Sequence, residues 1–131
     1  MALYDISCDD MAREDITVDS TPDEYLPLTP ALFHVLLALA DGEKHGYAIL
    51  KEVAERTNNA VVLSTGTLYG IIKRLLADGM IRPSAAGSTE RRQAYRLTAF
   101  GRSVALAEVN RLRDLVLSAE AKKLSVRPAK G

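Results

Sequence analysis

Residues 65–78 carry the most regular apolar period in the sequence, and the opposite side of the predicted helix is small, polar and cationic. The apolar positions recur at spacings of three and four residues, as in a helix that buries one face; they are Leu68, Ile71, Ile72, Leu75 and Leu76. The opposite face consists of Gly66, Thr67, Tyr69, Gly70, Lys73, Arg74 and Ala77. Such a surface, on a helix anchored along a single stripe, suits insertion into the major groove of DNA.

Two further helices are predicted before this one. Thr29 and Pro30 form a favourable helix start, and apolar side chains cover nearly the whole circumference of the helix over 30–41. In so small a domain, we expect a second chain to cover part of this helix. The helix over 45–57 buries a single stripe, and the link over 60–63 is apolar enough to pair briefly as a strand.

A β-hairpin and a long helix complete the predicted order. Met80–Arg82 and Arg92–Leu97 flank a turn-rich stretch, and the hairpin carries several arginines. Thr98 caps a helix over 99–124, which is about 39 Å long at ~1.5 Å per residue. Its apolar residues recur at alternating steps of four and three, which indicates a seam for a partner helix; they are Ala105, Val109, Leu112, Val116 and Ala119.

This order of elements predicts a mainly α chain of the α+β class, a winged helix-turn-helix with a long C-terminal dimerisation helix. The length of 131 residues suits one hydrophobic core. We expect four parts along the chain. They are an acidic, mobile N-terminal arm over 1–24 with room for one short helical turn, a DNA-binding domain over 25–97, the dimerisation helix over 98–124, and a frayed tail over 125–131.

The charge is divided unevenly along the chain, although the formal net charge is +0. Residues 1–30 contain eight acidic residues and one basic residue, a net charge of −7, and residues 31–131 contain 16 basic and nine acidic residues, a net charge of +7. The basic body indicates a polyanion partner, although many solvated surfaces have a similar balance. In one alternative, the acidic arm covers the basic face and inhibits binding.

Other classes of protein find little support in the sequence. Cys8 is the only cysteine, which excludes an intrachain disulfide, and a cytoplasmic location is the simplest expectation. No run of 18 apolar residues and no secretory signal pattern is present, so we expect no membrane span. His34 is expected in the core and His45 as a cap or surface group. They lie 11 residues apart without a paired ligand, so we predict no metal site, no cofactor and no enzyme activity.

Several short motifs together resemble the PadR family of winged-helix transcriptional regulators, over residues 26–124. The motifs are His45–Ile49, Gly66–Tyr69, Lys73–Leu75, Gly79–Ile81, Arg92–Thr98 and Gly101–Arg102. The resemblance implies a homodimeric, usually repressing, bacterial DNA-binding protein. It also implies that the single C-terminal helix, as in the shorter members, forms the dimer together with the N-terminal segment.

Pattern and resemblance together select two sets of residues. The residues expected to bind DNA are Ser64, Thr65, Thr67, Tyr69, Lys73, Arg74, Arg82, Arg91 and Arg92. The motif match implies that Thr67, Tyr69 and Lys73 make the helix contacts, with Tyr69 at a phosphate. The residues expected in the dimer interface are Leu36, Ala105, Val109, Leu112, Val116 and Ala119. A small-molecule effector of unknown identity would bind in that interface, and a winged-helix protein-interaction module without specific DNA binding is the alternative function.

Overall fold

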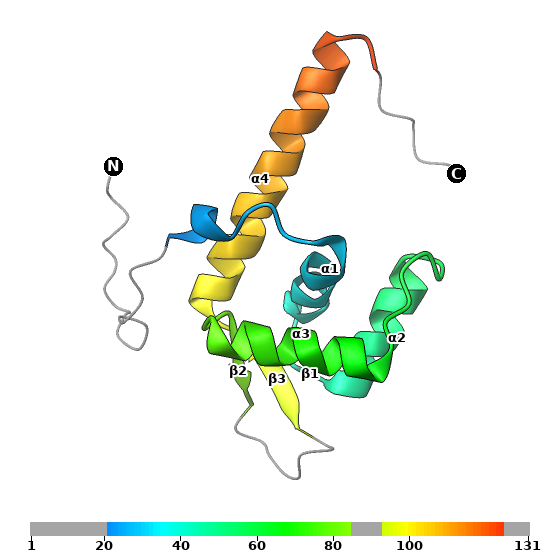
Figure 1. The fold of residues 1–131 in the computed structure, drawn as a ribbon, viewed down its shortest axis with the longest axis vertical. Coiled ribbons are helices and arrows are strands. Elements are labelled where there is room, and N and C mark those ends of the chain that lie inside the picture. Colours follow the sequence, from blue (N-terminus) through cyan, green and yellow to red (C-terminus); the bar gives the residue numbers. More distant parts are fainter. Residues whose placement is uncertain (1–20, 85–92, 125–131) are drawn as a thin grey trace.

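The computed structural model describes residues 21–84 and 93–124, and the chain forms a winged helix-turn-helix from which one long helix projects (Figure 1). The helices are the 3₁₀-helix η2 (Pro22–Tyr25), α1 (Pro30–Leu39), α2 (Gly46–Arg56), α3 (Thr65–Ala77) and α4 (Ala99–Ala121). The strands are β1 (Lys44–His45), β2 (Ile81–Pro83) and β3 (Ala94–Leu97). The predicted order of three helices, a two-stranded hairpin and a long helix is confirmed, and so is the fold class, while η2 and β1 are additional.

Hydroxyl side chains begin the helices where the sequence predicts them. The Thr29 Oγ1 accepts a hydrogen bond from the Leu32 N–H at 3.2 Å, and the Ser64 Oγ accepts one from the Thr67 N–H at 3.0 Å. The Thr98 Oγ1 accepts a third from the Gly101 N–H at 2.9 Å. Each bond satisfies a donor that the helix itself leaves without an acceptor. Local sequence therefore determines where α1, α3 and α4 begin.

The sheet contains one strand more than the hairpin. Its order is β1-β3-β2, and both pairs are antiparallel. The register places His45 opposite Ala94 and Arg82 opposite Arg96. The strand expected over 60–63 is wrong, because that link has no regular structure and only places the Leu63 side chain in the core. The short β1 instead supplies the third strand.

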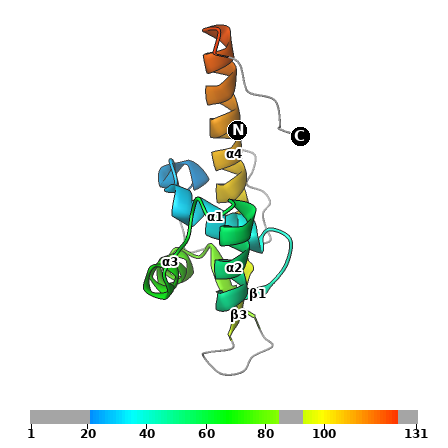
Figure 2. The ribbon, with the colours of Figure 1, turned by 90° about the vertical axis from the view of Figure 1, so that its right-hand side faces the viewer.

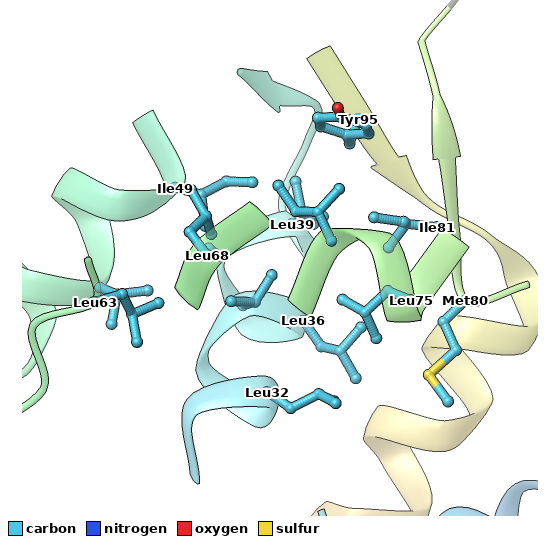
Figure 3. Packing of buried hydrophobic residues seen from close by; sticks show 14 of the residues in the cluster. Leu32, Leu36, Leu39, Ile49, Leu63, Leu68, Leu75, Met80, Ile81 and Tyr95 are labelled. Carbon is cyan, nitrogen blue, oxygen red and sulfur yellow. The ribbon is translucent and has the colours of Figure 1, made fainter. Parts of the chain in front are cut away.

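The core lies where α1 crosses the other elements. In Figure 3, leucines of α1 and α3 meet at its centre, with Ile49 of α2 on one side and Ile81 and Tyr95 of the sheet on the other. Helix α1 contacts α2, α4 and β3, which bury most of its apolar side chains within one chain, while Phe33 and Leu37 remain partly exposed. Leu36 is 0% exposed in this core. Its assignment to the dimer interface is therefore wrong, because the sheet and three helices surround it.

Helix α4 rises from the body on the side away from the wing (Figure 1). Its first turn lies so close to the start of β2 that a Cβ on Gly101 would come within 2.0 Å of the Met80 carbonyl oxygen. Tyr25 of η2 packs edge-on against Phe100, with ring centroids 5.7 Å apart. Pro22–Glu24 are thus held against the body, which corrects the mobile arm predicted for them. The rest of the arm and the tail lie outside the described residues.

Candidate nucleic-acid interface

The outer face of α3 is exposed along its length, as its sequence predicts. Leu68, Ile72 and Leu75 face the core, with exposed fractions of 0 to 2%. Six of the residues predicted to bind DNA lie in α3 or directly before it, and all six are exposed; they are Ser64, Thr65, Thr67, Tyr69, Lys73 and Arg74. In Figure 2, α3 is seen end-on at the edge of the body, where its outer side faces away from α2. The helix therefore presents a narrow polar surface of the size that the major groove admits.

Gly66 and Gly70 leave the outer face of α3 without protruding side chains at two positions. A Cβ built on Gly66 or on Gly70 meets no atom within 4 Å among the described residues. In the part of the chain that the structure describes, Gly70 is therefore not packed closely against a neighbouring helix. A glycine inside a helix costs about 1 kcal/mol relative to alanine. The space beside Gly70 is open to a molecule from outside the chain.

Tyr69 lies at the edge of this surface and reaches towards the start of α2. A Cβ on Gly46 would lie 2.3 Å from the Tyr69 hydroxyl oxygen, so the Tyr69 side chain would have to move if residue 46 were not glycine. The side chain remains 39% exposed. The sequence gives no sign of this contact, because Gly46 and Tyr69 are 23 residues apart and belong to different helices. Gly46 is thus a residue of the site that sequence reasoning missed.

Several basic residues of the body are engaged in holding the fold. The Lys44 Nζ donates to the Ala38 carbonyl at 2.6 Å, and the Arg102 Nη2 donates to the Ala40 carbonyl at 3.0 Å, which satisfies the C-terminal end of α1. Arg56 donates to the His34 carbonyl at 3.0 Å and forms an ion pair with Glu52. These cations are therefore structural, and the positive charge available to a ligand is smaller than the composition indicates.

His34 and His45 both lie outside the outer face of α3. His34 is half-buried rather than enclosed in the core, with its Nδ1 3.3 Å from the Arg56 Nη2. Partial burial and the neighbouring guanidinium lower the pKa of His34 below its usual value. His45 is exposed and pairs through its backbone in β1. Residues 21–84 and 93–124 contain no cluster of three or more His, Cys, Asp or Glu side chains able to hold a metal ion.

The wing places two arginines side by side. Arg82 on β2 is directly opposite Arg96 on β3, and both are exposed. The pair forms a second basic element, on the wing. The sequence likewise predicts Arg82 and Arg96 on one outer face of the hairpin, within a basic cluster with Arg91 and Arg92, and Arg91 and Arg92 lie outside the described residues.

The second half of α4 carries apolar side chains that the rest of the described chain does not cover. Leu112 and Val116 of the predicted seam are 38% and 41% exposed. Ala105 is half-buried against the core of its own chain, and Val109 and Ala119 are half-buried as well. Leu115, at 53% exposure, lies on the same stripe and was missed because it falls outside the strict steps of four and three.

A buried carboxylate joins α4 to the segment before α1. Glu108 is only 3% exposed and accepts hydrogen bonds at 2.7 and 2.8 Å from the guanidinium of Arg111. Hydrogen bonds from Arg111 and from the backbone of Leu28 lower the pKa of Glu108, although burial acts in the opposite direction. Sequence reasoning missed this residue, because a glutamate on a long helix is normally exposed.

Comparison with known proteins gives one family. The pattern of the transcriptional regulator PadR-like family matches residues 35–107, which is more than half of the chain. A transcriptional regulator from Clostridium thermocellum is 25% identical, covers 80% of this chain and 96% of its own, and superposes with a TM-score of 0.59. A PadR family transcription regulator from Clostridium difficile is 26% identical over 68% of this chain and 95% of its own, with a TM-score of 0.54.

A third similar structure is of a protein whose DNA binding is regulated by a small molecule. It describes regulation of the DNA binding of Bordetella bronchiseptica BpsR by 6-hydroxynicotinic acid. BpsR is 28% identical, with a TM-score of 0.55, over 71% of this chain and 61% of its own. The matches to two curated relatives, from Lysinibacillus sphaericus (28% identical) and Streptomyces fradiae (36% identical), span 53% and 62% of this chain but only 65% and 22% of those proteins.

None of the helices in residues 21–84 and 93–124 combines the length and the apolar character that a membrane span requires.

Proposed function

The chain belongs to the PadR-like family of transcriptional regulators, which bind DNA and are not enzymes, and we propose that it acts as a homodimeric repressor on a pseudo-palindromic operator. In this proposal, residues 25–97 form the DNA-binding domain and residues 98–124 the dimerisation helix. Each α3 occupies a major groove, and the two copies lie about 34 Å apart, one turn of the duplex. The Arg82–Arg96 pair of each wing binds phosphates beside the groove.

The observation that carries the proposal is the open outer face of α3. Gly66 and Gly70 leave space along it, and the exposed Lys73 and Arg74 flank that space with positive charge. The Arg74 Nε lies 3.4 Å from the Asp78 Oδ2, an exposed pair that a phosphate or a base can displace. A surface that combines low relief, hydroxyl groups and cations is suited to DNA.

The homodimer rests on the apolar side chains in the second half of α4. Leu112, Leu115 and Val116 continue the stripe that Val104 and Ala105 direct into the core of their own chain. A second α4 on this stripe would remove the apolar surface from water, at about 25 cal/mol per Å². An effector in that interface would change the distance between the two α3 helices and hence the affinity for DNA. The regulation of DNA binding of BpsR by 6-hydroxynicotinic acid supports control of the DNA affinity by a small molecule.

Selection of bound duplexes from a random DNA pool tests the function directly. We expect a consensus with two-fold symmetry, because a symmetric pair of α3 helices reads two identical half-sites. Tyr69→Ala should weaken binding to that consensus about tenfold or more, with an unchanged sedimentation coefficient. Tyr69→Phe is the matched variant that keeps the ring beside Gly46 and removes only the hydroxyl. Failure to recover any consensus would contradict the proposal, and full binding by Tyr69→Ala would remove Tyr69 from the contact set. Repression is then measured with a reporter gene downstream of the consensus.

A further inference from the structure

The wing, formed by β2 and β3, is fastened at its root around Ser84, the residue that directly follows β2. This residue is only 6% exposed, which is unusual for a serine. The Ser84 N–H donates to the Ala94 carbonyl at 2.8 Å and so extends the pairing of β2 with β3 by one residue. The Gln93 Nε2 donates to the Ala94 carbonyl at 2.8 Å and to the Ser84 carbonyl at 3.3 Å. The two strands are therefore joined at the point where the described part of the wing ends.

A hydrogen bond from a distant segment holds the same serine. The Ser84 Oγ donates to the Glu43 Oε1 at 2.8 Å, although the two residues are 41 positions apart. Glu43 directly precedes β1, which pairs with β3 on the side opposite β2. The bond thus joins the ends of the two outer strands, which do not pair with each other. A hydrogen bond from a hydroxyl to a carboxylate is charge-assisted and stronger than one between neutral groups.

The turn that carries Glu43 is itself fixed to the body of the domain. The Lys44 Nζ donates to the Ala38 carbonyl of α1 at 2.6 Å. The Arg102 Nη2, near the start of α4, donates to the Ala40 carbonyl at 3.0 Å. Because these bonds attach the turn to α1 and α4, Glu43 gives the wing a fixed point on the body.

The strands of the wing are too short to fix its direction by themselves. β2 contains three residues and β3 contains four, and a two-stranded hairpin is marginally stable alone. Neither Glu43 nor Ser84 belongs to the apolar cluster of the core. Loss of the bond between them therefore loosens the wing without removing a contact of the core.

Resting on the proposed function, we propose that Glu43 and Ser84 are positioning residues for the wing. Their hydrogen bond fixes the angle between the wing and the body, so that Arg82 and Arg96 meet phosphates while α3 occupies the major groove. Neither Glu43 nor Ser84 contacts the DNA. Loss of the bond lowers the affinity, because the wing must then be ordered at the moment of binding.

The affinity test compares two substitutions of Glu43 in the full-length protein. Both Glu43→Ala and Glu43→Gln remove the negative charge, but only glutamine keeps an oxygen that accepts the Ser84 hydroxyl. In fluorescence anisotropy with the selected consensus duplex, Glu43→Ala should bind about fivefold more weakly than Glu43→Gln, the effect of one hydrogen bond. In a Ser84→Ala background the two substitutions should bind equally, because the donor is gone. Glu120→Ala and Glu120→Gln, at an exposed position near the end of α4, are the matched control pair and should also bind equally.

Amide hydrogen exchange of the free protein tests the Glu43–Ser84 bond without DNA. Residues 81–84 and 93–97 should exchange about fivefold faster in Glu43→Ala than in Glu43→Gln, because one hydrogen bond at the root of the wing is lost. Exchange in α3 should stay the same in both variants, since the opening is confined to the wing.

Three results would overturn the proposal while the function of α3 stands. The first is equal exchange of the wing in the two Glu43 variants, and the second is faster exchange of the wing with equal affinities for DNA. The third is an exchange rate that rises as much in α3 as in the wing, which indicates a general loss of stability. If the wild-type protein selects no consensus, the proposed function fails, and the positioning role fails with it.

Discussion

Replacing Gly70 by alanine is expected to stabilise the protein. Gly70 lies inside the 13-residue helix α3, and a Cβ built on it meets no atom of the described residues within 4 Å. The substitution therefore brings no steric cost within the chain, and the helix gains the full difference in propensity, about 1 kcal/mol. In a chain of 131 residues, that gain corresponds to a rise in Tm of roughly 3 to 6 °C. Circular dichroism during urea and thermal unfolding, at one fixed protein concentration, measures both quantities.

The same substitution is expected to weaken binding to DNA. The added methyl group stands on the outer face of α3, where the walls of the groove come close in the proposed complex. An overpacked contact costs about 1–3 kcal/mol, which corresponds to a rise in Kd of roughly 5- to 150-fold. Anisotropy titration of the labelled consensus duplex measures this change. Gly70→Ala is thus expected to raise stability and to weaken DNA binding at the same time. A substitution that only disturbs folding would lower both.

Asn110→Ala is the control for the Gly70 experiment. Asn110 is an exposed residue within α4, and alanine there also raises helix propensity, by about 0.6 kcal/mol. It should increase stability with no change in Kd. A Gly70→Ala protein that is more stable and binds DNA as tightly as wild type would refute the placement of DNA on this face. A destabilised Gly70→Ala protein would show that the space beside Gly70 is occupied.

Three further changes test the rest of the structure. Gly101→Ala should destabilise the chain by about 1–3 kcal/mol in urea unfolding, because its Cβ would meet a backbone carbonyl 2.0 Å away, and a neutral outcome would refute that close approach. Glu108→Gln should cost about 1–3 kcal/mol at pH 7 through the weakened bond to Arg111. The bond to Arg111 lowers the pKa of Glu108 in the folded protein, so its contribution to the free energy of unfolding is complete above the ordinary carboxyl pKa of about 4.3 and is lost as the pH falls towards the lower folded value. The free energies of unfolding of wild type and Glu108→Gln should therefore converge in acid. A difference between them that is independent of pH contradicts this reasoning. Leu112→Asp should give monomers in sedimentation while the control Asn110→Asp does not, and an intact Leu112→Asp dimer excludes that stripe as the interface.

Local chemistry in the sequence was enough to predict most of the fold. The helix starts at Thr29, Ser64 and Thr98 depend on hydroxyls that bond within three residues, so each is visible in a short window. Gly79 follows the end of α3 and adopts a φ of +75°, which glycine tolerates and which is typical of the residue after a helix. The apolar stripe of α3 and its exposed opposite face followed from one helical period.

The features that the sequence did not reveal depend on contacts between distant segments. A strand of two residues such as β1 has no periodicity and forms because β3 offers it a free edge. Leu36 was assigned to the interface instead of the core for the same reason. A helix with apolar residues on most sides has the same sequence pattern whether its own chain or a partner chain covers it. Gly46 and Glu108 acquire their roles only from Tyr69 and Arg111, which the fold brings to them.

The attachment of α4 has a mechanical consequence. The Thr98 Oγ1 donates to the Gly79 carbonyl at 2.6 Å, and the Thr98 N–H donates to the Met80 carbonyl at 3.0 Å, so the base of α4 is fastened to the end of α3. The 23 residues of α4 extend about 35 Å from that joint. If α4 tilts by about 5° about its C-terminal end, its N-terminal end and the attached α3 move by roughly 3 Å, close to the ~3.4 Å rise of one base pair. In a dimer formed by two α4 helices, a molecule that separates these helices by a few degrees would move the two α3 helices out of register with the major grooves of the DNA.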